Sequence, residues 1–118
     1  MSDYRNLEVW KKSRVLAAEV SRVTEGFPRS EVFGVTSQIR RAAVGIGLNI
    51  AEGNGRWTRL DRRQFIINAR ASAQEVEAVL FIAEDLKYIT AEVSERLRKA
   101  TNEIGRMLNG LARYYAKT

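Results

Sequence analysis

Apolar residues recur along the chain at spacings of three and four positions, which is the period of an amphipathic α-helix. Four stretches carry this pattern, and none alternates polar and apolar residues as a half-buried strand does. The pattern predicts helices over about residues 7–24, 32–52 and 58–86, and from Thr90 to near the end of the chain. For the second and third helices, the positions expected to face the core are Val35, Ile39, Ala42, Ala43, Ile46 and Ile50, and Phe65, Ala69, Ser72, Val76, Leu80, Ala83 and Leu86.

Residues that cap or end helices lie between these stretches. Gly26 and Pro28 interrupt the first pattern, and Thr58 and Thr90 stand at the N-cap positions of the third and fourth helices. Four helices with short connections predict an all-α fold, an antiparallel up-down-up-down four-helix bundle. A helical-repeat solenoid is the alternative, but the chain has no internal repeat. With 118 residues and 45% hydrophobic content, we expect one domain over residues 1–118.

Gly45 and Gly47 lie inside the second predicted helix, where each glycine costs roughly 1 kcal/mol relative to alanine. They fall between two apolar sides of that helix, the core stripe and an opposite side made of Val44, Leu48 and Ala51. We expect the missing side chains to let neighbouring helices approach closely at the flanks. A chain of this size cannot bury both apolar sides by itself, so the pattern predicts a homo-oligomer.

The outer side of the third predicted helix shows the same feature with Ile67 and Phe81. Isolated apolar residues are ordinary on protein surfaces, which is the alternative interpretation. Because two helices share the feature, we assign both to an oligomer interface. Arg40 and Arg41 are assigned to the same interface, where they would pair with Glu52 or with acidic residues of a neighbouring subunit.

The chain is basic, and its charge is unevenly distributed. Twenty Lys and Arg against fourteen Asp and Glu leave a net charge of +6, and residues 40–70 alone hold seven arginines against two acidic residues. Stripes of cations can follow a phosphate backbone, and Trp57 is available for base stacking, so we expect RNA or DNA as a partner. The alternatives are a solvated basic face and a Trp57 that packs over the end of the bundle. The candidate nucleic-acid-binding residues are Arg56, Trp57, Arg59, Arg63, Arg70, Lys99, Arg106 and Arg113.

Residue types that support catalysis are scarce. The chain has no cysteine and no histidine, which removes thiolate chemistry, the commonest general base and the commonest transition-metal ligand. The glycines at 45 and 47 lack the third glycine and the preceding strand of a dinucleotide-binding motif. Asn49, Glu52 and Gly53 are interpreted as a structural motif with local hydrogen bonds at the end of the second helix. We therefore expect no enzyme activity, no cofactor and no metal.

The sequence also bears on location. No stretch of eighteen apolar residues predicts a membrane span, and the N-terminal segment MSDYRNLEVW lacks the apolar core of an export signal. We expect a cytoplasmic protein with no membrane partner.

Three segments resemble the successive signatures of one bacterial family. They are LEVWKKSRVLAAEV, GVTSQIRRAAVGIGLNIAEGNGR and QFIINARASAQEVEAVLFIAEDLKYI, of which QIRRAA and NIAEG are the most specific parts. The chain thus resembles the bacterial four-helix bundle proteins encoded in intervening sequences of large-subunit ribosomal RNA genes. The resemblance implies a bundle that assembles as a ring, with pentamers among similar proteins. It also implies a relation to the accessory protein of diversity-generating retroelements, a basic, nucleic-acid-associated partner of a reverse transcriptase.

Two functional classes follow from these observations. The first is a nucleic-acid-binding accessory protein that acts as a homo-oligomer. The second is an oligomeric protein-interaction scaffold with no role in nucleic-acid binding. Affinity that falls steeply with salt concentration is expected of the first class only.

Overall fold

The computed structural model describes residues 3–117 and contains four α-helices and two short 3-10 helices. In chain order these elements are η1 (Tyr4–Asn6), α1 (Glu8–Thr24), η2 (Arg29–Glu31), α2 (Val35–Asn54), α3 (Arg59–Asp85) and α4 (Ala91–Ala116). No strand occurs within this part of the chain. The prediction of an all-α four-helix fold is confirmed.

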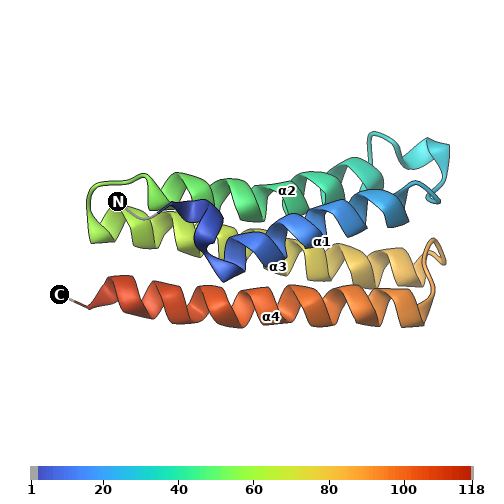
Figure 1. Ribbon diagram of the computed structural model, residues 1–118. Coiled ribbons are helices and arrows are strands. Elements are labelled where there is room, and N and C mark those ends of the chain that lie inside the picture. Colours follow the sequence, from blue (N-terminus) through green and yellow to red (C-terminus); the bar gives the residue numbers. More distant parts are fainter. Residues whose placement is uncertain (1–2, 118) are drawn as a thin grey trace.

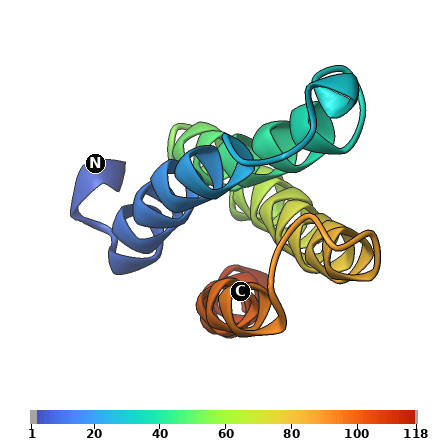
Figure 2. The ribbon, with the colours of Figure 1, turned by 90° about the vertical axis from the view of Figure 1, so that its right-hand side faces the viewer.

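The four helices form an elongated bundle that measures 47 × 22 × 20 Å along its principal axes. Consecutive helices run in opposite directions (Figure 1). α1 packs against α2 and α4, and α3 packs between α2 and α4, as the view along the bundle shows (Figure 2). The up-down order brings the α2–α3 loop to the end of the bundle where the chain starts and finishes, and it brings the α1–α2 and α3–α4 connections to the opposite end (Figure 1).

The predicted caps of the third and fourth helices are confirmed. The Thr58 hydroxyl accepts a hydrogen bond from the Asp61 backbone N–H (3.1 Å), and the Thr90 hydroxyl accepts one from the Val93 backbone N–H (3.2 Å). These bonds satisfy backbone donors that a first helical turn otherwise leaves unpaired.

α2 begins three residues later than the periodicity predicts. Residues 29–31 form the 3-10 helix η2, and the Glu31 carboxylate accepts a hydrogen bond from the Val35 backbone N–H (3.3 Å). The Tyr88 hydroxyl donates to the same carboxylate (2.8 Å), and this hydrogen bond raises the pKa of Tyr88 above its usual value. Glu31 therefore caps α2 and ties it to the connection between α3 and α4.

The predicted core stripe of α2 is largely confirmed, because every member except the half-buried Val35 is buried. On α3 the prediction for Leu86 is wrong. Leu86 is the C-cap residue, and 47% of its surface is exposed. α3 packs against both α2 and α4, so its buried face is wider than one stripe. The buried residues of α3 that the periodicity missed are Ile66, Ala73 and Val79.

The glycines of α2 lie where neighbouring helices approach closely, as predicted. A Cβ atom on Gly45 would lie 3.3 Å from the Ser72 hydroxyl of α3, and one on Gly47 would lie 3.1 Å from the Ser13 hydroxyl of α1. α2 nevertheless remains one continuous helix from Val35 to Asn54. The two glycines thus lower the helix propensity of α2 and allow α1 and α3 to pack closely against its two flanks.

Gly53 makes the tightest of these approaches, and we expect Gly53→Ala to destabilise the fold. An added Cβ would lie 2.9 Å from the Phe65 Cβ and 3.3 Å from the Arg62 carbonyl oxygen, neither of which can move without the backbone of α3. Urea unfolding followed by circular dichroism should show a loss of about 1–3 kcal/mol.

Gly105→Ala is the matched control, because a Cβ at this position in α4 meets nothing within 4 Å. It should stabilise the protein by about 0.5–1 kcal/mol through helix propensity alone. A Gly53→Ala variant that is as stable as the parent would contradict the argument from close approach.

Candidate nucleic-acid interface

The bundle separates charge along its length. Residues 3–15, 45–72 and 104–117 form the half that contains the α2–α3 loop (Figure 1). This half carries twelve Lys and Arg against four Asp and Glu, a net charge of +8. The other half, residues 16–44 and 73–103, carries eight against ten, a net charge of −2. We call the first half the cationic half. Arg40 and Arg41, which contribute to the basic stretch in the sequence, lie outside it.

The α2–α3 loop presents Trp57 to solvent with 97% of its surface exposed. The interpretation in which Trp57 packs over the bundle end is therefore wrong. The loop itself is well braced. The Arg62 side chain donates to the Arg56 carbonyl (2.7 Å), and the Arg56 guanidinium pairs with Glu52 (2.8 Å) and lies 4.5 Å from the centre of the Phe65 ring. These contacts hold the residues next to Trp57, while its own ring is uncovered.

Arg59 and Arg70 connect α3 to the C-terminal part of α4. The Arg59 guanidinium donates to the Tyr114 carbonyl and lies 4.8 Å from the centre of the Tyr114 ring. Carbonyls in the last turn of a helix lack partners within that helix, so Arg59 serves as a cap for α4. Arg70 donates to the Asn109 side-chain oxygen (3.0 Å). Both guanidinium groups are thus oriented by contacts with α4 while they stay exposed to solvent.

The other predicted cations differ in their surroundings. Arg63 is half-buried, and its Nε is buried without a hydrogen-bond partner. Arg106 and Arg113 are exposed and seven residues apart, which places them on one face of α4. Among the described side chains, neither forms a hydrogen bond or an ion pair. Lys99 lies in the opposite half and pairs with Glu95 (3.8 Å), so the structure does not bring it together with the rest of the predicted set.

The predicted oligomer interface is centred on two exposed residues of α2, Val44 and Leu48, while Ala51 is half-buried. Two clefts meet at Val44 and Leu48. One has a volume of about 470 Å³ and the other, towards α1, about 170 Å³. The remaining residues that line the larger cleft are Val32, Thr36, Ser37, Arg40 and Arg41. The smaller cleft is also lined by Trp10, Ser13, Arg14, Ala17, Ala43 and Gly47.

Arg40 is held within the chain. Its guanidinium donates to the Thr24 hydroxyl (2.8 Å) and to the Ser21 carbonyl (3.2 Å), and so links α2 to the end of α1. Arg40 does not pair with Glu52 of the same chain, because the two residues are about 18 Å apart along the continuous helix α2. Glu52 pairs with Arg56 instead. Arg41 is exposed and lines the larger cleft.

The two predicted interface residues of α3 are separate from this surface. Ile67 is half-buried, and Phe81 lies beneath the Arg98 guanidinium of α4, 4.2 Å from the centre of the ring. Neither residue lines the clefts beside Val44 and Leu48. The structure therefore brings together the α2 residues of the predicted interface and leaves the α3 residues elsewhere.

A family model described as 23S rRNA-intervening sequence protein matches residues 5–110 of the chain. The chain belongs to this family. A solved structure of a protein with unknown function from the S23 ribosomal protein family of Bacteroides thetaiotaomicron is 26% identical, with a TM-score of 0.80. The similarity covers 88% of this chain and 97% of the other. A search of curated proteins found no match.

In this member of the 23S rRNA-intervening sequence protein family, the NIAEG segment makes local structural contacts. The Asn49 amide donates to the Gly45 carbonyl one turn earlier (2.8 Å), Glu52 pairs with Arg56, and Gly53 allows α3 to approach. Within residues 3–117, no group of three or more acidic residues is placed to hold a metal ion. No helix in the same range is both long enough and apolar enough to cross a membrane.

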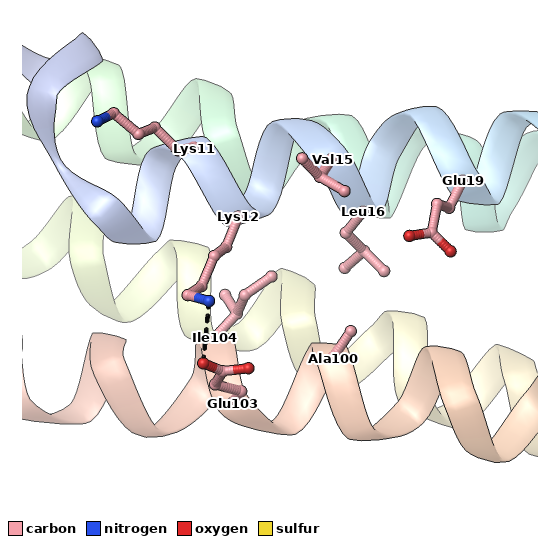
Figure 3. A pocket seen from close by; sticks show the side chains of 8 residues that line it. All are labelled: Lys11, Lys12, Val15, Leu16, Glu19, Ala100, Glu103 and Ile104. Carbon is pink, nitrogen blue, oxygen red and sulfur yellow. Dashed lines mark ion pairs between the residues drawn. The ribbon is translucent and has the colours of Figure 1, made fainter.

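A further cleft, which the sequence did not indicate, lies between α1 and α4 (Figure 3). It has a volume of about 290 Å³, and Leu16 and Ile104 contribute apolar side chains to it. The Lys12–Glu103 ion pair (3.1 Å) joins the two helices beside the cleft. A possible signal was Val15, an apolar residue next to the core residue Leu16, but periodicity alone does not distinguish it from an isolated surface residue.

Proposed function

We propose that this family member is a non-enzymatic, homo-oligomeric protein that binds nucleic acid through its cationic half. The observation that carries the proposal is the separation of charge, +8 in one half against −2 in the other. A surface with a high net positive charge attracts a polyanion and raises its association rate. Phosphate contacts by Lys and Arg supply affinity that depends little on base sequence.

The fixed arginines support this assignment. Arg59 and Arg70 are already held by α4, so a phosphate that meets them does not have to immobilise two flexible side chains. Arg106 and Arg113 add cations on the outer face of α4 that other groups of the described chain do not neutralise. The combination provides both preformed and adaptable phosphate contacts.

The exposed residues Val44 and Leu48 support the homo-oligomer. They are exposed one turn apart on α2 and line two clefts that meet there, and adjacent exposed apolar residues beside a cleft mark interaction sites. A second copy of the chain that covers this surface would leave the α2–α3 loop accessible, because the loop lies at the end of the bundle (Figure 1). Assembly would then repeat the cationic half around one particle.

The proposal is tested by reversing charge at the two exposed arginines of α4. We expect Arg106→Glu with Arg113→Glu to weaken binding to an oligouridine on the order of tenfold or more. The slope of log affinity against log salt concentration should decrease by about 0.7 for each lost contact. Fluorescence anisotropy at several salt concentrations measures both quantities.

A matched control changes the net charge by the same amount at the other end. Arg22 and Arg29 are also exposed, and they belong to the half with net charge −2. Arg22→Glu with Arg29→Glu should leave binding nearly unchanged. Equal losses of oligouridine affinity in the two double variants would mean that binding depends on total charge alone. The cationic half would then not be the binding site.

An oligomeric protein-interaction scaffold is the second candidate. It is favoured by Phe33, which is 95% exposed beside the exposed Val32 in the half opposite to the basic loop. A fully exposed phenylalanine next to an aliphatic residue suits a protein partner. This candidate predicts weak nucleic-acid binding in the parent protein and no selective effect of the Arg106 and Arg113 reversals.

A further inference from the structure

The most exposed aromatic side chain in the described part of the chain lies in a loop whose neighbouring residues are held in place. Trp57 is 97% exposed, yet the residues on both sides of it are fixed. Arg56 is held by Glu52 and by the Arg62 side chain, and the Thr58 hydroxyl caps α3. A large indole ring in water is unfavourable and contributes nothing to the packing of the bundle. Its placement therefore points to a ligand that covers the ring.

The ligand must suit both a flat aromatic face and the surrounding charge. Unpaired nucleobases offer aromatic faces for stacking, whereas the bases of a duplex are stacked on each other and hidden. The linked phosphates of the same strand suit the neighbouring cations. We propose that Trp57 is a base-stacking platform and that the cationic half binds single-stranded nucleic acid or unpaired loops. This inference rests on the proposed function and adds the class of ligand.

The cations follow a track that suits a strand. Arg106 and Arg113 are seven residues apart, so they lie along one face of α4, and Lys117 is the C-cap residue just beyond the end of that helix. Seven residues of α-helix span about 10 Å, and Lys117 extends this row of cations, so the row can meet more than one phosphate. These cations belong to the last part of α4 and its C-cap, while Trp57 belongs to the α2–α3 loop, which lies at the end of the bundle (Figure 1). A strand can pass along the cations and place one base on the indole.

A lipid surface is the competing ligand for an exposed tryptophan near arginines. Leu60, the second residue of α3, is 77% exposed and would enter the interface with Trp57. A membrane surface is flat. It therefore cannot contact Trp57 and Leu60 at the end of the bundle and the cations along the side of α4 at the same time. The extended track therefore favours a strand over a lipid surface.

The experiment compares three variants of the full chain on three polyanions. The ligands are an oligouridine of about 20 nucleotides, which exceeds the usual site of about 4–16 nucleotides, a perfect RNA duplex of the same length, and heparin. Trp57→Ala should weaken oligouridine binding about tenfold and leave duplex and heparin binding unchanged. Trp57→Phe, which keeps a ring, should retain most of the affinity. Leu60→Ala removes an exposed apolar side chain without a ring and should have no effect.

Fluorescence provides a second measurement. The chain has two tryptophans, and the half-buried Trp10 packs against Tyr4 with their ring centres 5.2 Å apart. In a Trp10→Phe background, oligouridine should quench the emission of Trp57, and heparin should not. Quenching of equal size by heparin would show that stacking is not its cause and would overturn the inference.

The outcomes separate this inference from the proposed function. Salt-dependent binding of oligouridine by the parent, with equal affinity in Trp57→Ala, overturns the stacking platform and leaves the proposed function intact. A parent that binds neither oligouridine nor duplex overturns both. A third outcome assigns the loop to a lipid surface instead. In that case vesicles of phosphatidylglycerol shift the emission of Trp57 to the blue, and Leu60→Ala weakens vesicle binding. Trp57→Ala then has no effect on oligouridine binding.

Discussion

Leu48→Glu is expected to convert the protein into a monomer of 13.4 kDa that keeps its helical circular dichroism. Leu48 is 65% exposed on the outer side of α2, so a glutamate there does not disturb the core of a single bundle. In the proposed homo-oligomer the same position is covered by a neighbouring subunit. A carboxylate buried there without a partner costs several kcal/mol, about enough to dissociate a small interface. Sedimentation velocity at micromolar concentration measures the change.

Val15→Glu is the control, because Val15 is a similarly exposed aliphatic residue on α1 that lines the α1–α4 cleft. It should leave the assembly intact. If Val15→Glu dissociated the assembly and Leu48→Glu did not, the interface would lie at the α1–α4 cleft and not on α2. A parent protein that already sediments at 13.4 kDa would refute the homo-oligomer altogether. Loss of helical signal in Leu48→Glu would place Leu48 in the folding core instead.

The second large effect concerns the length of the bound strand. One cationic half offers a few phosphate contacts, which give weak binding at physiological salt. Each further copy in an oligomer adds another such half and a net charge of +6. Once one subunit has bound a long strand, the next subunit meets it at a high effective concentration. We expect affinity to rise on the order of 10²-fold or more between oligouridines of about 10 and 60 nucleotides, as fluorescence anisotropy would measure.

The same length series in Leu48→Glu isolates the role of assembly. The monomer keeps Trp57 and every cation, so it should bind the shortest strand as well as the parent does. Its affinity should then rise only in proportion to the number of sites on a longer strand. Binding by the intact oligomer that does not depend on strand length would contradict the multivalent mechanism and favour the scaffold function.

Local patterns in the sequence were enough to predict the helices and the close approaches along α2. Periodicity gave the fold class, and Thr58 and Thr90 marked two helix starts correctly, because a cap acts through atoms a few residues away. The two apolar sides of α2 also placed Gly45 and Gly47 correctly at its flanks. The start of α2 was missed because the Glu31 side chain, from outside the helix, provides its cap.

By itself, then, the sequence determined which segments are helical and that the chain is basic, since both depend on residue type and short spacing. Only the tertiary structure decided which charges act together. The up-down topology gathers residues 3–15, 45–72 and 104–117 into one half and moves Lys99 into the other. The hydrogen bond from Arg59 to the Tyr114 carbonyl joins residues 55 positions apart. No local pattern encodes such a bond, because its energy depends on how the helices pack.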